Sequence, residues 1–350
     1  LGLATLSTKY VSLNSKYTGE ASILAILMMI FGVAILLLNQ ISVKSRKSYT
    51  TVTGKSGQIS KFNLGRSGKY IIAIILIIIT FFTSIFPIVS FAFETFLPNP
   101  GDYSFLYTGD PDNLTTKWWV TNENITENGM YGQQGILYND MIWHAYKGTI
   151  MVSVCCALTA GTIGTLIGYA VSKNRRSRWA NYVNSMAFLP YLMPSIAVGV
   201  AFFILFSNKY VNLFNTYALL IIVGTVKYIP FASRSSLNSM LQLSGEIEEA
   251  AIIQDIPWTK RMTRIIIPIQ KTSIISGYLL PFMTCLRELS LFILLCVQGF
   301  ILSTTLDYFD EMGLYAFSSG INLILIVTIL ICNALVNKAT GASLDKGIGG

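Results

Sequence analysis

Side chains that could carry out chemistry are few in this sequence and do not form a recognisable site. His144 is the one histidine among the 350 residues. All the cysteines lie inside apolar stretches, where cysteine behaves as a small hydrophobic residue: Cys155, Cys156, Cys285, Cys296 and Cys332. Metal sites and disulfide frameworks need ligand spacings that these residues lack. The sequence therefore predicts no catalytic residue, no bound metal and no cofactor.

One short motif points toward a nucleotide, but it is incomplete. Gly54-Lys55-Ser56 matches the end of a phosphate-binding loop, whereas Tyr49 occupies the position of the first glycine. No strand is predicted before it, although such a loop follows a strand. The sequence therefore contains no visible nucleotide site.

Arg287 and Glu288 are adjacent charges within a long apolar stretch, residues 273–297. A charge inside a bilayer costs several kcal/mol unless it is paired or hydrated. Neighbouring helix residues point about 100° apart, so these two cannot simply pair face to face. Each is predicted either to bond a neighbouring helix and stiffen the bundle, or to line a transport pathway.

The composition predicts an integral membrane protein. Hydrophobic residues make up 53% of the chain and charged residues 12%, and the mean hydropathy is +0.57. Soluble domains carry about 25% charged residues. Seven predominantly apolar stretches are long enough to cross about 30 Å of hydrocarbon: residues 21–40, 70–92, 148–171, 183–206, 210–230, 273–297 and 319–337. Lys227, near the end of the fifth stretch, is expected to extend its amine to the lipid headgroups.

The charges between these stretches predict the orientation of the chain. Segments 41–69, 172–182 and 231–272 are rich in Lys and Arg, whereas segment 93–147 holds seven acidic residues against two lysines. Segment 298–318 has acidic residues and no basic one. Because an excess of Lys and Arg marks the cytoplasmic side, the basic segments are predicted to be cytoplasmic. The net charge of +8 is then a consequence of topology, not of nucleic-acid binding.

A stretch rich in Gly, Ser, Thr and Lys divides the chain and is typical of a flexible linker. The predicted segments are residues 1–41 (an extracytoplasmic start and the last transmembrane helix of an upstream half), 42–69 (a basic cytoplasmic linker), 70–337 (six spans, with an outer loop at 93–147 and a cytoplasmic loop at 231–272) and 338–350 (a cytoplasmic tail).

Small residues and prolines indicate how the spans pack and bend. Three glycines at helical spacing predict close helix packing, within the chain or with a second half: Gly161, Gly164 and Gly168. Three prolines interrupt spans and indicate bends whose freed backbone groups need partners: Pro190, Pro194 and Pro281.

The cytoplasmic segment 231–272 has too few apolar residues to span a membrane, but it carries the pattern of two short helices. Ser244 can cap the first helix. Acidic residues follow in its first turns, where the helix dipole favours anions: Glu246, Glu248 and Glu249. Pro257 is well placed to begin the second helix, which gives a bend at Asp255. An ordinary solvated loop is the alternative.

This segment resembles the EAA loop of the permease subunits of binding-protein-dependent ABC importers. The family pattern is Glu-Ala-Ala, three residues, Gly, nine residues, Ile, any residue, Leu and Pro. Glu249-Ala250-Ala251, Ile265 and Pro268 fall in register with it. Ile267 replaces the leucine, and Asp255 replaces the glycine. Glycine tolerates a positive φ freely, and aspartate is one of the better substitutes for it, so the departure at Asp255 bears on the geometry of the bend and not on the helix pair.

The resemblance implies an all-α permease module of six helices, multi-pass in the bacterial cytoplasmic membrane and without chemistry of its own. In that family the loop docks on a cytoplasmic ATPase subunit. Glu249 would face a basic or backbone partner, and the two alanines would allow close packing. The residues implied for this coupling loop are Glu248, Glu249, Ala250, Ala251, Asp255, Ile265 and Pro268. The implied partners are ATPase subunits, an extracytoplasmic substrate-binding protein, a second permease half and the lipid bilayer, with no nucleic acid.

Two further stretches resemble the ferric-iron type of these permeases, Leu189-Pro190-Tyr191-Leu192-Met193-Pro194 and Leu286-Arg287-Glu288-Leu289-Ser290. Proteins of that type are often fused pairs of six-span halves. The chain is therefore interpreted as a C-terminal half, with ferric iron as a cargo held by the binding protein. An ion-coupled secondary transporter is the alternative. It would need ionisable or broken-helix sites repeated in two halves, and Arg287-Glu288 alone qualifies. A membrane enzyme would need a nucleophile, an acid–base pair or a metal set, and none was found.

Overall fold

The computed structural model describes residues 65–104, 114–125, 132–207 and 210–340, with six helical positions between residues 23 and 34. The predicted first span, linker and tail lie outside the described residues, apart from those positions and the edges of the linker and the tail. The described residues form helices joined by turns, without a strand. An all-α fold was predicted, and it is confirmed. The chain divides into two compact units.

The smaller unit comprises residues 34–138 and 315–323. It contains one long helical element, made of α3 (Gly65–Thr80), the π-helical η1 (Phe81–Ile85) and α4 (Phe86–Glu94). None of the apolar window of this element is buried within the chain. Such a surface is expected of a helix that faces lipid or another protein in the membrane.

A small core follows α4 in the same unit. The short helix α6 (Lys117–Val120) places Trp118 in it. The indole Nε1 of Trp118 donates a hydrogen bond to the carbonyl of Leu97 at 2.7 Å. Its ring meets Phe317 edge-on, with 5.9 Å between the ring centroids. Trp118 and Phe317 are nearly two hundred residues apart in the chain, so this contact joins the two segments of the unit.

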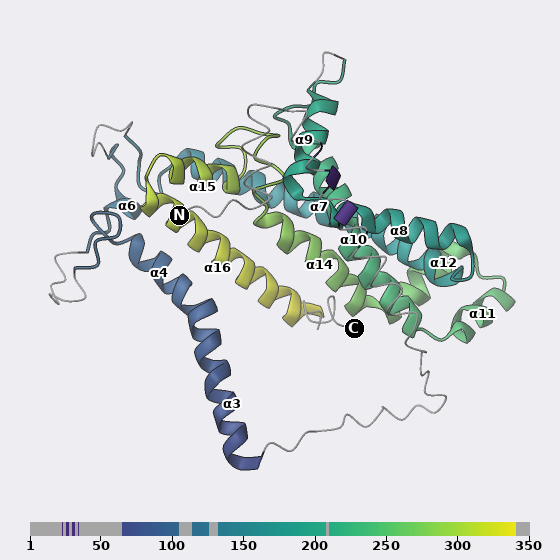
Figure 1. The fold of residues 1–350 in the computed structure, drawn as a ribbon. Helices are drawn as coiled ribbons and strands as arrows, with labels where there is room; N and C mark the ends of the chain where they lie inside the picture. The colour runs from purple at the N-terminus through teal and green to yellow at the C-terminus, as the bar shows by residue number, and fades with distance from the viewer. Residues whose placement is uncertain are drawn as a thin grey trace. The chain divides into compact units, whose positions relative to one another are not determined.

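The larger unit holds most of the remaining helices. In chain order they are α7 (Asp140–Lys173), α8 (Arg178–Leu192), α9 (Ser195–Phe206), α10 (Tyr217–Gln242), α11 (Gly245–Ile253), α12 (Trp258–Arg261), the π-helical η3 (Met262–Ile266), α13 (Ile267–Ile269), α14 (Lys271–Leu286) and α15 (Leu302–Glu311). Helix α16 (Tyr315–Thr340) begins in the smaller unit and continues in the larger one. Helices α7, α10 and α14 run side by side and carry the core (Figure 1).

The predicted glycine face is confirmed, and its contacts lie within the chain. A β-carbon on Gly164 would lie 2.5 Å from that of Ala232, and one on Gly168 would lie 2.7 Å from the backbone nitrogen of Leu237. Helix α7 therefore lies directly against the backbone of α10. A β-carbon on Gly161 would lie 2.4 Å from the ring of Tyr278 on α14. Small residues allow this close approach.

Four of the described helices are long and apolar enough to cross a membrane, and two bent pairs raise the number to at most six. The four are Ser67–Glu94, Asp140–Lys173, Tyr217–Gln242 and Tyr315–Lys338. Helices α8 and α9 form one bent pair at 100°, and Trp258–Ile269 with α14 forms the other at 86°.

Two predicted helix boundaries and the predicted position of the Lys227 side chain were wrong. The helix expected at 210–230 begins at Tyr217 and continues to Gln242, with Pro230 inside it. The helix expected to fill 273–297 ends at Leu286, because turns replace it from Arg287 onward. Lys227 does not reach toward headgroups. It is 8% exposed, and its amine bonds two backbone carbonyls inside the unit.

Candidate functional site

The loop between α10 and α14 consists of two helices joined by a sharp bend, as predicted. Ser244 is the N-cap residue of α11, although its side chain makes no capping hydrogen bond. At the end of that helix, Asp255 N bonds Ile252 O and Ile256 N bonds Ala251 O. This pair of bonds is the Schellman arrangement, which places its C′ residue in the left-handed region. Asp255 is this C′ residue, with a φ of 54°. It lies at the position where the EAA pattern has glycine, so aspartate here takes the backbone conformation that glycine adopts most easily.

The second helix starts after Pro257 and is bonded to α10 at its far end. Helix α12 continues through η3 into α13, which ends at Ile269, so Pro268 lies one residue before the end. The side chain of Gln270 donates to the carbonyl of Ser239 at 3.0 Å and accepts from the Ser239 hydroxyl at 2.8 Å. This reciprocal pair holds the 86° bend into α14.

Glu248 is the buried charge of the loop, with 6% of its side chain exposed. It accepts a hydrogen bond from the Tyr169 hydroxyl at 2.5 Å and forms an ion pair with Lys173, both on α7. Arg261 of α12 lies 3.9 Å from the same carboxylate and donates to the carbonyl of Ile256 at 3.0 Å. One carboxylate thus ties α11 to α7 and to α12, an arrangement that we call the Glu248 clasp.

The electrostatics of the clasp favour the charged form of Glu248. Burial by itself raises the pKa of a carboxyl group. Here the hydrogen bonds from Lys173 and Tyr169, together with the charge of Arg261, outweigh burial and hold the pKa of Glu248 below its usual range. Glu248 is therefore a positioning group whose bonds all lie within the chain.

The remaining residues predicted for the loop divide between its two faces. Glu249 and Ala250 are exposed, as a partner contact requires. Ala251 is only 5% exposed, so the expectation that both alanines face a partner was wrong for Ala251. Its burial follows from helix phase, because it lies three residues beyond the buried Glu248. Ile265 is partly buried. Tyr169 and Lys173 were not predicted as partners of Glu248, and Lys173 entered the prediction only as part of the basic segment 172–182.

Arg287 and Glu288 are not in the middle of a helix, contrary to the prediction. Arg287 is the C-cap residue of α14 and is exposed. The carboxylate of Glu288 accepts from the Tyr228 hydroxyl at 3.0 Å and from the Leu291 backbone nitrogen at 3.1 Å. Glu288 therefore has partners on α10 and in the turns that replace the helix.

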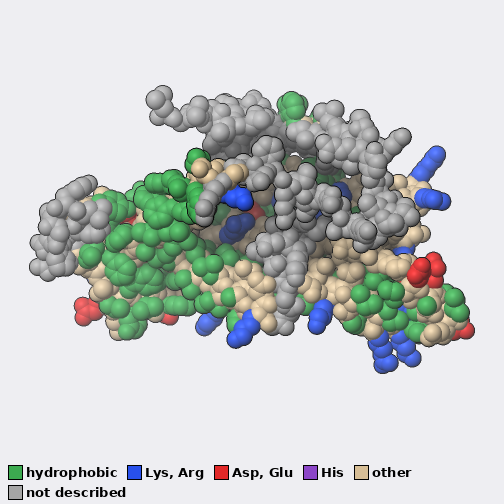
Figure 2. Space-filling model, turned by 90° about the horizontal axis from the view of Figure 1, so that it is seen from below, with side chains coloured by type: hydrophobic (Ala, Val, Ile, Leu, Met, Phe, Trp, Pro, Cys, Tyr) green, Lys and Arg blue, Asp and Glu red, His purple; other side chains and the backbone are tan. Residues whose placement is uncertain are grey.

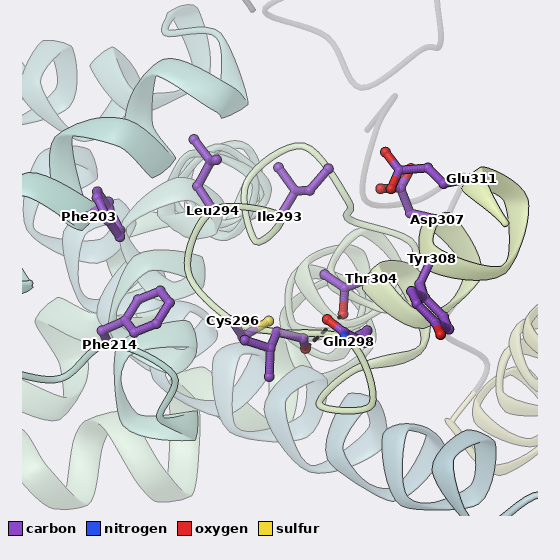
Figure 3. Close-up of a pocket in the computed structure, with 11 residues that line it drawn as sticks. Phe203, Phe214, Ile293, Leu294, Cys296, Gln298, Thr304, Asp307, Tyr308 and Glu311 are labelled. Carbon is purple, nitrogen blue, oxygen red and sulfur yellow. Dashed lines mark hydrogen bonds between the residues drawn. The ribbon is translucent and has the colours of Figure 1, made fainter. Parts of the chain in front are cut away.

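A cavity of about 350 Å³ is bounded by α9, by α15 and by the turns that follow α14. Figure 3 shows Asp307 and Glu311 of α15 on one side, with Phe203 and Phe214 on the other. Burial, and the charges of Glu311 and Asp310, raise the pKa of Asp307 above its usual range. The side of the cavity formed by Asp307 and Glu311 lies in the acidic segment 298–318, which is predicted to be extracytoplasmic.

Comparison with protein families gives a match over the second half of the chain. Residues 160–342 match the family described as "Binding-protein-dependent transport system inner membrane component". The range includes the clasp, the bend at Asp255 and the interrupted helices α8–α9 and α14.

Curated relatives are similar over a wider range at low identity. The ferric transport system permease protein FbpB of Actinobacillus pleuropneumoniae is 22% identical over 294 residues, which cover 84% of this chain and 39% of that protein. The putrescine transport system permease protein PotI of Escherichia coli K12 is 26% identical over 204 residues, which cover 56% of this chain and 68% of that protein. The chain thus spans less than half the length of the ferric transport relative.

Solved structures share the fold. A chain of a bacterial ABC transporter involved in the import of the acidic polysaccharide alginate matches with a TM-score of 0.56 and 16% identity, covering 79% of this chain and 98% of that one. A second match, with a TM-score of 0.54 and 14% identity, is the alginate ABC transporter in complex with an alginate pentasaccharide-bound periplasmic protein. It covers 79% of this chain and 96% of the matched chain.

Proposed function

Because the chain belongs to the family of binding-protein-dependent transport system inner membrane components, the permeases of ABC importers, we propose that the loop between α10 and α14 docks on a cytoplasmic ATPase subunit. In this role it transmits the movement of that subunit to the spans. The observation that carries the proposal is an exposed apolar face on α11, an element that the Glu248 clasp ties to α7.

The exposed face of the loop has the chemistry of a protein interface. Ile253 is 83% exposed, Ile252 is 50% exposed and Trp258 is 43% exposed. Apolar side chains grouped in a polar segment mark a binding surface, and an amphipathic helix that lies in a groove is a common recognition mode. Figure 2 shows acidic and basic side chains beside hydrophobic ones at the end formed by α11 and α12. Glu249 is exposed on the same helix and can supply a polar contact at the rim.

The loop is built to transmit displacement. Only Leu243 and Ser244 separate α10 from α11. Met262 and Ile266 of η3 pack with Met240 of α10 and Ile274 of α14 in one buried cluster. A packed cluster of this kind transmits a displacement because it resists deformation. A pull on α11 is therefore expected to move α7 and α10.

Family membership supports the partners and the location that we propose. ATP hydrolysis would belong to the ATPase subunits, and a second permease half, fused or separate, would complete the pathway in the bacterial cytoplasmic membrane. An extracytoplasmic substrate-binding protein would deliver the cargo. The alginate transporter found with its periplasmic protein supports this last partner. Family membership favours ATP-driven import over ion-coupled secondary transport.

For the cargo we propose ferric iron, supported by the ferric transport relative and by the resemblance at residues 189–194 and 286–290. Uptake of radioactive ferric citrate by cells with and without the chain tests it, with radioactive putrescine as the comparison. Chain-dependent uptake of iron but not of putrescine is the expected result. Chain-dependent uptake of putrescine alone would overturn the assignment.

Docking of the loop is tested by co-purification of the ATPase from native membranes. Ile253→Glu places a charge at the most exposed apolar position of α11. Affinity is expected to fall roughly tenfold or more, as for loss of an interface hot spot. Ile253→Leu, which keeps the apolar surface, is the matched control and should retain the ATPase. Glu249→Arg is expected to weaken the complex as well. If both charge changes left ATPase binding and uptake intact, the loop would not be the docking element.

A further inference from the structure

Two adjacent residues of α10 contact two separate interruptions of membrane helices. The first interruption lies between α8 and α9, which meet at 100°. Nζ of Lys227 donates to the carbonyl of Pro190 at 3.1 Å and to that of Met193 at 2.6 Å. The last carbonyls of a helix have no partner within it, and in hydrocarbon an unsatisfied one costs several kcal/mol. A buried ammonium group both bonds these carbonyls and complements the helix dipole.

The second interruption follows α14, which ends at Leu286. The hydroxyl of Tyr228 donates to Oε2 of Glu288 at 3.0 Å. Oε1 of Glu288 accepts from the backbone nitrogen of Leu291 at 3.1 Å, and its backbone carbonyl accepts from the Ser303 hydroxyl at 2.8 Å. Glu288 thus caps the turns that replace the helix, and Tyr228 holds Glu288 in that position.

The two interruptions also contact each other. A β-carbon on Gly199 of α9 would lie 2.7 Å from the carbonyl oxygen of Leu291, so α9 meets the backbone of the turns after α14. Leu291 and Phe292 are 0% and 1% exposed and belong to the same core cluster as Tyr228. Helix α9 and the segment 287–301 therefore form one packed layer against α10.

We propose that Lys227 and Tyr228 make α10 the common support of both interruptions, so that α9 and segment 287–301 move together as one body. Lys227 is then a positioning residue. It fixes where span 178–206 bends and, through that bend, how the turns after α14 are held. The part that this joint movement would play during import rests on the proposed function, because the movement of α10 would come from the loop between α10 and α14. The support of both interruptions by α10 does not depend on the proposed function.

The native cysteines provide reporters for a test that needs neither ATPase nor cargo. Cys296 lies in the second interruption and is 5% exposed, whereas Lys227 bonds the first. The test uses the purified chain in lipid nanodiscs. In Lys227→Met, N-ethylmaleimide is expected to alkylate Cys296 roughly tenfold faster or more than in the wild type, as loss of a hydrogen bond to a charged group predicts. Cys332 of α16, read by mass spectrometry in the same sample, should keep its wild-type rate.

Arg234→Met is the matched control. Arg234 is another cation of α10 facing α8, where it lies 4.5 Å from the ring centre of Phe188, but it does not bond the interruption. The control should leave Cys296 unchanged. If Lys227→Met fails to fold, Lys227→Gln keeps an uncharged N–H donor group and is expected to give an intermediate rise in the alkylation rate of Cys296. A wild-type rate at Cys296 in a folded variant would overturn the proposal, and so would an equal rise at Cys332, which reports general unfolding.

Discussion

Gly164 lies where the backbone of α7 approaches that of α10. A β-carbon added there would lie 2.5 Å from Cβ of Ala232 and 2.7 Å from the backbone nitrogen of Ser233. Non-bonded carbon atoms are in contact at about 3.5–4.0 Å. The replacement Gly164→Ala therefore requires the two helices to separate by roughly 1 Å at this level.

The steric cost of Gly164→Ala is expected to be about 1–3 kcal/mol, the range for an extra methylene group in a well-packed core. Alanine also improves helix propensity by about 0.8–1.0 kcal/mol, which partly conceals that cost. Gly277→Ala is the matched control. Gly277 lies on α14, and its added β-carbon would meet Ser235 of α10 at ordinary distances of 3.4 and 3.5 Å. The propensity gain is common to both variants, so their difference isolates the steric cost.

Equilibrium unfolding of the purified chain in mixed micelles measures both variants. Gly164→Ala should unfold more easily than Gly277→Ala by about 1–3 kcal/mol, and Gly277→Ala should be as stable as the wild type or slightly more stable. Equal stability of the two variants would mean that α7 and α10 are not in backbone contact at Gly164, and the reasoning from the glycine face would fail.

Three further predictions test the loop between α10 and α14 and the cavity beside α15. The pKa of Glu248 is lowered in the folded state. Its charge therefore stabilises the fold at a pH above the ordinary pKa of about 4.3, and this stabilisation is lost as the pH falls through the lowered pKa. Melting temperatures measured against pH should show this loss in the wild type and not in Glu248→Gln. The pKa of Asp307 is raised, so its charge costs stability as the pH rises through that pKa; Asp307→Asn should melt higher than the wild type at pH 7, and an unchanged melting temperature would contradict the burial argument. At Asp255, where φ is 54°, Asp255→Gly should be at least as stable as the wild type and Asp255→Ala less stable, by up to about 1–2 kcal/mol in thermal unfolding.

The helix pair of the loop could be predicted because its signals are local. Ser244 begins α11, Asp255 closes it in a left-handed conformation, and Pro257 begins the next helix. Each of these is a preference of one residue for one backbone position. The glycine face of α7 was predictable for a similar reason, since its helical spacing alone places the glycines on one side.

Pro194, the N-cap residue of α9, indicated the break between α8 and α9, but Pro281 lies inside α14, and the end of α14 at Leu286 was not predictable from hydrophobicity. A window of apolar residues gives the same signal whether the helix inside it continues or breaks. The break becomes tolerable through partners far away in the sequence, and Lys227 lies 37 and 34 residues from the two carbonyls it bonds. The same lysine was assigned to the headgroups because its position near the end of an apolar stretch suits that role equally well.

Helices α7 and α10 make the most extensive helix–helix contact of the described residues, and this limits where movement can occur. They meet backbone to backbone at Gly164 and Gly168, so they cannot slide past each other without separating. The Glu248 clasp holds the loop to α7, and the pair of bonds at Gln270 holds it to α10. A displacement of the loop must therefore carry α7 and α10 as one body. The Gln270 pair also holds the 86° bend into α14, and Lys227 bonds the 100° break between α8 and α9 to α10, so a displacement of α10 is expected to reach both places.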